Sequence, residues 1–198
     1  ITPLEKYGIQ TMSIGFLIAE DTPMIWRGPM VMGAIKQLLY EVEWSNIDIL
    51  VLDLPPGTGD TQLTLAQQVP ISGSVIVSTP QDIALLDVKK GINMFRKVDI
   101  PVFGVIENMS YFICPNCSEK TEIFNSGGAK KTAENYDIDF LGDIPLHTSI
   151  REHADFGKPF TLDEKNELSK LYQNIAKKLI DKIYNDKSII EPKIKFVD

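Results

Sequence analysis

Short runs of apolar, β-branched residues alternate along the chain with segments in which apolar residues recur at helical spacing. The apolar runs predict strands at residues 13–18, 47–54, 74–79 and 102–107. The helical periodicity predicts helices at residues 26–42, 61–69 and 83–97. Residues 47–54 are almost continuously apolar, as strands are when helices cover both faces of a parallel sheet. We therefore expect an α/β fold, a three-layer parallel sheet with helices on both faces.

The last part of the chain predicts a loop, two further elements and a long helix. After residue 107 the pattern breaks into a loop that holds both cysteines, followed by a helix at 129–136 and a short strand at 140–144. The final segment has the apolar face of a long amphipathic helix, with Thr161 and Glu164 as a capping box before it. We expect one domain at residues 1–160 and a C-terminal amphipathic helix and tail at residues 161–198. The helix should pack on its own domain; binding a partner is the alternative.

The composition and charge exclude two classes of partner. Of the 198 residues, 43% are hydrophobic and 24% are charged, so the chain can form a core without disulfides or a structural metal. The 20 Lys and Arg against 27 Asp and Glu give a net charge of −7, which disfavours binding to a phosphate backbone. No apolar run approaches the roughly 18 residues of a membrane span. We expect no nucleic acid and no membrane among the partners.

The cysteines and the first residue add two expectations. Cys114 and Cys117 are too few for the disulfide framework of a small secreted fold, so a reducing compartment, the cytoplasm, is expected. The chain begins with Ile1 instead of Met and has no basic or amphipathic leader. We therefore expect a fragment or a processed chain.

The segment at residues 48–60 is the first candidate for chemistry. It combines a hydrophobic strand that ends in Asp53 with two prolines and then two glycines, Gly57 and Gly59. Ligands bind at the carboxyl ends of strands in parallel sheets, where a carboxylate can hold Mg²⁺ directly or through water. The glycines allow backbone amides to approach an anion closely. A plain turn after the strand is the alternative.

The second candidate is the Cys-x-x-Cys pair formed by Cys114 and Cys117. This spacing brings two thiolates to one side of a loop, so both can ligate one soft metal centre. A redox dithiol and two incidental thiols are the alternatives, although a thioredoxin-like dithiol usually lies at a helix N-terminus and this pair follows a late strand. A tetrahedral zinc or a 4Fe-4S cluster takes four ligands, so a two-fold dimer would complete the site.

Asn108 is a third candidate, at the predicted end of the strand that precedes the cysteine loop. Its side-chain amide can present both a donor and an acceptor to the edge of a purine. Asn is also a common turn residue, so a purely local role in a turn is the alternative.

Five segments together resemble one family. The string Asp53-Leu54-Pro55-Pro56-Gly57-Thr58-Gly59-Asp60 resembles the Walker B and switch II segment of the Mrp/ApbC family, iron-sulfur cluster carrier ATPases related to MinD within the deviant P-loop class. The other matching segments follow in the family's order: Trp26-Arg27-Gly28-Pro29-Met30, Thr79-Pro80-Gln81-Asp82-Ile83-Ala84-Leu85, Glu107-Asn108-Met109-Ser110 and Gly127-Gly128-Ala129. The resemblance covers residues 7–157.

The resemblance implies a P-loop NTPase fold and a role for each candidate residue. Asp53 would be the catalytic residue that organises Mg²⁺ and water, the Gly57 amide would sense the γ-phosphate of ATP, and Asn108 would recognise adenine. Cys114 and Cys117 would ligate a 4Fe-4S cluster that bridges a homodimer through the Cys-x-x-Cys loop. The partners would be apo iron-sulfur proteins, in the cytoplasm or, for a eukaryotic relative, in the mitochondrial matrix.

One family motif does not occur in the sequence. No G-x-x-x-x-G-K-[ST] phosphate loop is found, and by resemblance it would lie upstream of Ile1. We therefore expect this chain alone to be inactive as an ATPase. The resemblance also implies that the absent part supplies a central strand beside the strand that ends in Asp53, which would otherwise expose an unpaired edge.

Two other functions remain open at this point. One is a MinD- or ParA-like positioning ATPase, although such a protein has no use for the cysteine pair, and the C-terminal helix lacks a clearly basic face for lipid. The other is a nucleotide-free remnant that binds only a metal or a partner.

Overall fold

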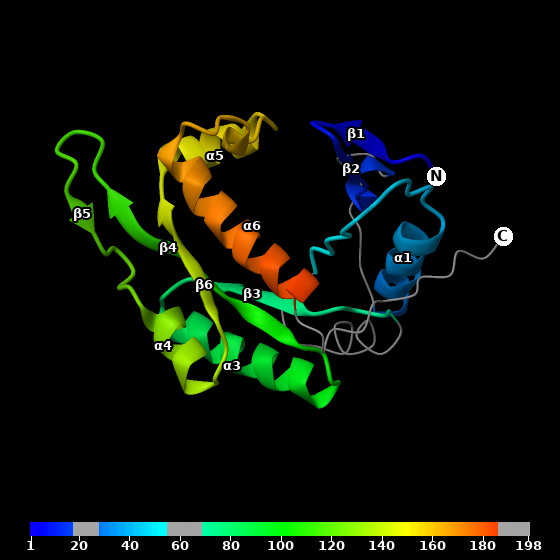
Figure 1. Ribbon diagram of the computed structural model, residues 1–198, viewed down its shortest axis with the longest axis horizontal. Coiled ribbons are helices and arrows are strands. Elements are labelled where there is room, and N and C mark those ends of the chain that lie inside the picture. The colour runs from blue at the N-terminus through cyan, green and yellow to red at the C-terminus, as the bar shows by residue number, and fades with distance from the viewer. Residues whose placement is uncertain (18–27, 55–68, 186–198) are drawn as a thin grey trace. The chain divides into compact units, whose positions relative to one another are not determined.

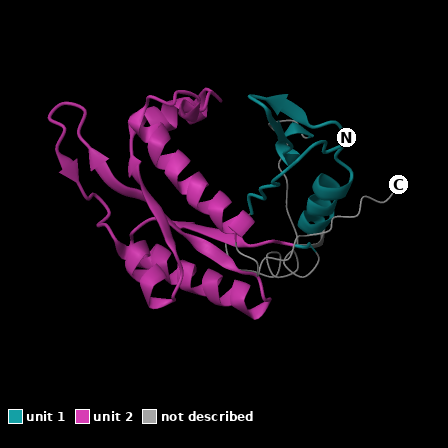
Figure 2. Cartoon of the chain, viewed as in Figure 1, with its two compact units in different colours: residues 1–70, 193–198 teal, residues 71–192 magenta. Residues whose placement is uncertain are grey.

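The structure is a computed structural model that describes residues 1–17, 28–54 and 69–185. The chain divides into two compact units, one within residues 1–70 and one within residues 71–192 (Figure 2). Each has its own secondary structure, and the predicted parallel sheet belongs to the second.

The first unit begins with a small antiparallel hairpin and contains one α-helix. β1 (Leu4–Lys6) pairs with β2 (Ile9–Thr11), and the two residues between them, Tyr7 and Gly8, both have positive φ, as a two-residue hairpin turn requires. The helix predicted at 26–42 is confirmed as α1 (Gly28–Tyr40) over its described part. The strand predicted at 13–18 is wrong in its described part. That part holds η1 (Ile14–Phe16), a turn of 3₁₀ helix capped by the Ser13 hydroxyl.

The apolar run at residues 47–54 does not form the predicted buried strand. It has no strand pairing in the structure, and Val51 is 82% exposed. A parallel strand forms only when neighbouring strands satisfy its N–H and C=O groups, and among the described residues no strand pairs with this run. The hydrophobic pattern was therefore not sufficient to place it in a sheet. Most of the helix predicted at 61–69 lies outside the described residues.

The second unit contains the parallel sheet. β3 (Ser74–Ser78) and β6 (Phe140–Leu146) both pair with β4 (Val102–Ile113) in parallel, and β5 (Lys120–Thr121) pairs with the end of β4 in antiparallel orientation. The remaining elements are α3 (Asp82–Lys97), α4 (Gly128–Asn135), α5 (Thr148–Asp155), η2 (Phe160–Leu162) and α6 (Glu167–Asn185). The strands predicted at 74–79 and 140–144 and the helices predicted at 83–97 and 129–136 are confirmed within a few residues.

Helices cover both faces of this sheet, which confirms the predicted fold class (Figure 1). Adjacent residues of β4 contribute to the two cores, because successive side chains of a strand point to opposite faces. Val105 packs with Ile92 of α3 and Ala133 of α4, whereas Ile106 packs with Leu141 of β6 and Ile175 of α6. The result is the expected three-layer arrangement.

The long C-terminal helix is part of the second unit. α6 packs against β6, as expected for a helix that packs on its own domain. The two compact units divide the chain at residue 70, whereas the sequence predicted a boundary at residue 160. The predicted capping box is wrong, because the Asn166 side chain accepts from the Leu168 N–H at 2.9 Å and Thr161 lies within η2. Among the described helices, α6 included, none has the length and apolar character to cross a membrane.

Candidate functional site

The carboxyl ends of the parallel strands form the edge of the sheet at which ligands bind in α/β folds. Ser78, the last residue of β3, pairs with Glu107 of β4, and Asn108 pairs with Ile144 near the end of β6. Asn108 is half-buried. The fold therefore places its side-chain amide at the edge where the sequence predicted a ligand contact.

Asn108 begins an irregular stretch of β4. Its Oδ1 accepts a 2.9 Å hydrogen bond from the backbone N–H of Met109, whose φ of 55° lies in the left-handed region. The pairing with β6 shifts between Asn108 and Phe112, so β4 bulges here. The strand predicted to end at residue 107 continues to Ile113, because the chain pairs again beyond the bulge.

Glu107 is a residue whose individual role the sequence did not reveal. Its carboxylate is buried, and Oε1 accepts from the Ser110 hydroxyl at 2.5 Å and from the Gly127 N–H at 2.8 Å. Oε2 accepts from the Ala129 N–H at 2.8 Å, in the first turn of α4. These donors, with the positive end of the helix dipole, compensate for burying the charge. The sequence signal is an acidic residue that ends an apolar run.

The two cysteines lie at the tip of a hairpin formed by β4 and β5. The Cys114 N–H donates to the carbonyl of Glu119 at 3.0 Å, and the Ser118 N–H donates to the carbonyl of Cys114 at 2.8 Å. Ser118 has a φ of 59°, which reverses the chain after Cys117. The loop that connects β4 to β5 projects from the end of the sheet (Figure 1).

Both thiols are free, with Cys114 half-buried and Cys117 exposed. The backbone N–H of Cys117, then that of Asn116 and the Cys117 side chain, hydrogen-bond to the Cys114 sulfur and lower the pKa of this thiol below its usual range. A lowered pKa increases the thiolate fraction, the form that binds metals and acts as a nucleophile. The Cys114 thiol is therefore easier to deprotonate, and so to use as a metal ligand, than an ordinary cysteine thiol.

The hairpin is supported by a contact across its two strands. The Lys120 ammonium lies 3.9 Å from the centre of the Tyr111 ring, a cation–π pair. Partial burial and the nearby Asp143 carboxylate raise the pKa of the Tyr111 hydroxyl above its usual range. The cation–π pair thus joins β4 and β5 next to the thiol-bearing loop.

The two thiols have no third ligand close by in the described part of the chain. No group of three or more His, Cys, Asp and Glu side chains there is arranged to hold a metal ion. A tetrahedral metal or a cubane cluster takes four protein ligands. A single hairpin of this chain can therefore supply half of such a site.

The other predicted site residues lie outside the second unit. Asp53 is exposed at the end of the 47–54 segment, which belongs to the first unit. Gly57 and the rest of the predicted anion-binding turn lie outside the described residues. The structure therefore places Asn108 in β4 and both cysteines in the loop that follows this strand, and the roles of all five residues stay predictions.

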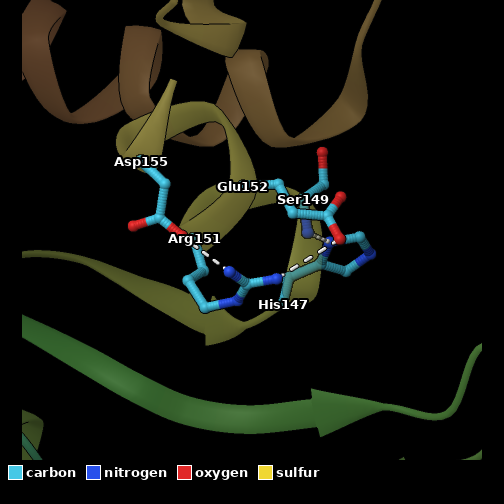
Figure 3. A network of polar contacts seen from close by, with 5 residues as sticks. All are labelled: His147, Ser149, Arg151, Glu152 and Asp155. Atoms are coloured by element: carbon cyan, nitrogen blue, oxygen red, sulfur yellow. Dashed lines mark hydrogen bonds and ion pairs between the residues drawn. The ribbon is translucent and has the colours of Figure 1, made fainter. Parts of the chain in front are cut away.

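A polar network at the end of β6 has a structural explanation. The His147 Nδ1 caps α5 by accepting from the Ser149 N–H at 3.1 Å, and Arg151 pairs with Asp155 at 2.6 Å and with Glu152 at 3.4 Å (Figure 3). The ion pairs are exposed and lie along one helix, so each contributes about 0.5 kcal/mol or less to stability. We assign this network to α5 itself and not to chemistry.

Comparison with known proteins identifies relatives of the whole chain. A family model described as ParA, NUBPL iron-transfer P-loop NTPase, matches residues 1–180. The iron-sulfur cluster transfer protein NUBPL of Dictyostelium discoideum is 54% identical over 182 residues, which are 91% of this chain and 56% of that protein. The iron-sulfur cluster carrier protein of Escherichia coli K12 is 48% identical over 197 residues, 99% of this chain and 53% of that protein. The chain thus spans little more than half the length of these relatives.

Solved structures agree on the fold. A nucleotide-binding protein from Archaeoglobus fulgidus in complex with ADP has a TM-score of 0.66 and 39% identity over 79% of this chain and 61% of its own. The cell division protein MinD from Aquifex aeolicus has a TM-score of 0.53 and 18% identity over 80% of this chain and 62% of its own. The MinD match supports the fold alone.

Proposed function

The chain belongs to the family of NUBPL iron-transfer P-loop NTPases, and on that premise we propose that it is the larger part of an ATP-dependent carrier that binds an iron-sulfur cluster and passes it to apo-proteins. The observation that carries this proposal is the hairpin of Cys114 and Cys117. Its two free thiols, one with a lowered pKa, lie at an exposed tip where a cluster can be received and released.

The cluster is the cargo of this carrier, and we propose that it is a 4Fe-4S cubane shared by two copies. Each chain offers two thiolates, and a cubane takes four cysteine ligands. A homodimer that joins the two hairpin tips supplies the full set with no further residue. The ligand count and the exposure of Cys117 support this arrangement.

Asn108, Asp53 and Gly57 each keep a separate proposed role toward a nucleotide. Asn108 lies at the carboxyl edge of the sheet with an amide suited to the edge of adenine, and a relative with 39% identity is described in complex with ADP. Asp53 offers an exposed carboxylate, a hard oxygen ligand of the kind that Mg²⁺ prefers, and the ion would stabilise charge on the phosphates. The Gly57 amide would contact the γ-phosphate.

We assign ATP hydrolysis to a full-length protein of the relatives' length, which would carry a phosphate loop in addition to these 198 residues. The 198 residues contain no G-x-x-x-x-G-K-[ST] motif, and the curated relatives are almost twice as long as the part that this chain matches. This chain alone should therefore show no turnover. Free thiols also favour a reducing compartment, the cytoplasm or the mitochondrial matrix of a eukaryote.

Cluster transfer to an acceptor tests the proposed function directly. The full-length protein is loaded with iron and sulfide under anaerobic conditions and mixed, with an iron chelator present, with an apo-enzyme that requires a 4Fe-4S cluster. The wild type should restore enzyme activity, whereas Cys114→Ala and Cys117→Ala should not. Asn116→Ala is the matched control, because it changes the same loop but keeps the backbone N–H that faces Cys114. Equal activation by Cys117→Ala would contradict the proposal.

A further inference from the structure

Glu107 holds both legs of the cysteine hairpin at their base. On the first leg, within β4, the Ser110 hydroxyl donates to its carboxylate at 2.5 Å. On the second leg, which runs from β5 to α4, the N–H groups of Gly127 and Ala129 donate at 2.8 Å each. The two cysteines lie between these legs, so one side chain fixes the position of the chain on both sides of the thiols.

The burial of this carboxylate shows that the contact is tightly constrained. Glu107 is 1% exposed, and among the described residues no lysine or arginine forms an ion pair with it. A buried carboxylate without a cation depends on its hydrogen-bond donors. If Ser110 or the start of α4 shifts, the other leg must follow or a donor is lost.

The next residue along β4 connects this clamp to the nucleotide site. Asn108 follows Glu107 directly, and its Oδ1 accepts from the N–H of Met109, the residue with positive φ in the bulge. The same oxygen is the acceptor that a purine amine would use. This oxygen has two lone pairs, so the base and the Met109 N–H would share it, and Ser110 is the next residue in the chain.

We propose that Glu107 is a positioning residue that couples the occupancy of the nucleotide site to the geometry of the thiols. This inference rests on the proposed function in one respect, the assignment of Asn108 to the base. In this proposal a base bound at the Asn108 Oδ1 weakens the hydrogen bond from the Met109 N–H, and the bulge shifts at the neighbouring Ser110. Through the shared carboxylate of Glu107, that movement reaches both legs of the hairpin at once, so the accessibility of Cys114 and Cys117 changes with the nucleotide.

Thiol reactivity in the cluster-free, full-length protein measures this coupling. The rate of alkylation by N-ethylmaleimide is followed by mass spectrometry on the peptide that contains both cysteines, with and without saturating ADP. In the wild type ADP should accelerate alkylation by about fivefold or more, the range of typical allosteric coupling. In Glu107→Gln the new NH₂ group faces a backbone N–H of α4, so one hydrogen bond of the clamp is lost. The ratio of the alkylation rates with and without ADP should then fall to about one.

Glu122→Gln is the matched control, because it makes the same chemical change at an exposed position of the same hairpin and should keep the wild-type ratio. The rates are measured well below the melting temperature of each variant, so that unfolding does not contribute to the ratio. If Glu107→Gln does not fold, Ser110→Ala removes one leg of the clamp and should lower the ratio.

The possible outcomes separate this inference from the proposed function. The inference is wrong if Glu107→Gln folds and shows the same ratio as the wild type. If only Ser110→Ala folds, the same ratio in that variant overturns it. A wild-type protein that binds ADP by calorimetry but shows a ratio near one also overturns it, while nucleotide binding stands. A wild-type protein that binds no ADP at all overturns both.

Discussion

Gly128, the first residue of α4, lies directly against the carbonyl oxygen of Pro80 in the loop after β3. A Cβ placed on Gly128 would be 2.8 Å from that oxygen and 2.7 Å from the Leu85 side chain, closer than such atoms approach. The absence of a side chain thus lets α4 begin beside the loop and present its first amides to Glu107.

Gly128→Ala should therefore destabilise the protein by about 1–3 kcal/mol, the usual cost of overpacking. Gly33→Ala is the control, because Gly33 lies in α1 with nothing within 4 Å of its Cβ position, and there alanine should stabilise the helix by up to about 1 kcal/mol. Urea unfolding of the three proteins gives both values. A neutral Gly128→Ala would show that α4 can retreat from the loop without cost.

Two valines test where the core of this chain lies. Val105 is fully buried between β4 and the helices α3 and α4, so Val105→Ala should lower the free energy of unfolding by about 1.5–3 kcal/mol. Val51 is exposed, and Val51→Ala in the 198-residue chain should change it by less than about 0.5 kcal/mol. A large effect at Val51 would indicate that this side chain is buried, as the sequence pattern predicted.

These two positions also show what the sequence could and could not predict. Residues 83–97 were recognised as a helix because an amphipathic period is a local property, and their core face then follows from the same spacing. Residues 47–54 have an equally clear apolar pattern. A strand, however, depends on partners distant in the sequence, and the pattern of one segment does not show whether those partners are present.

Some residues of the candidate site could likewise be predicted from the sequence, and others could not. The pair Cys114 and Cys117 could be found from spacing alone, because two thiols three residues apart are close in any local backbone conformation that turns, whether a loop or a helix start. The role of Glu107 could not, because it depends on amides of Gly127 and Ala129 that only the folded chain brings to it. The bulge after Asn108 likewise arises from pairing with both β5 and β6.

The Cys114 thiol should react with alkylating agents at a lower pH than an ordinary cysteine. Hydrogen bonds to the Cys114 sulfur lower its pKa, so its thiolate forms at lower pH than an ordinary cysteine thiolate and its alkylation rate should rise at lower pH. Cys117→Ser, which keeps a hydroxyl donor beside Cys114, isolates this thiol. Its alkylation rate measured against pH should have a midpoint below that of free cysteine, and a midpoint at or above that of free cysteine would contradict the hydrogen-bonded arrangement.

Asp53→Ala in the full-length protein should lower the rate of ATP hydrolysis by about a hundredfold or more, because the carboxylate is proposed to organise Mg²⁺. Asp48→Ala changes a carboxylate in the same segment and should leave the rate unchanged. Steady-state phosphate release measures both. An unchanged rate in Asp53→Ala would remove that residue from the proposed catalytic site.

The central claim is that two copies of the protein share one cluster through Cys114 and Cys117. The most direct measurement is the iron and sulfide content of the anaerobically reconstituted full-length protein, combined with sedimentation of the loaded species. We predict a dimer with about two iron and two sulfide per chain, one cubane for two hairpins. Cys114→Ala and Cys117→Ala should lose nearly all bound iron yet keep the wild-type melting temperature, because the core does not depend on metal. A cluster-loaded monomer, or full iron loading of Cys117→Ala, would contradict the account.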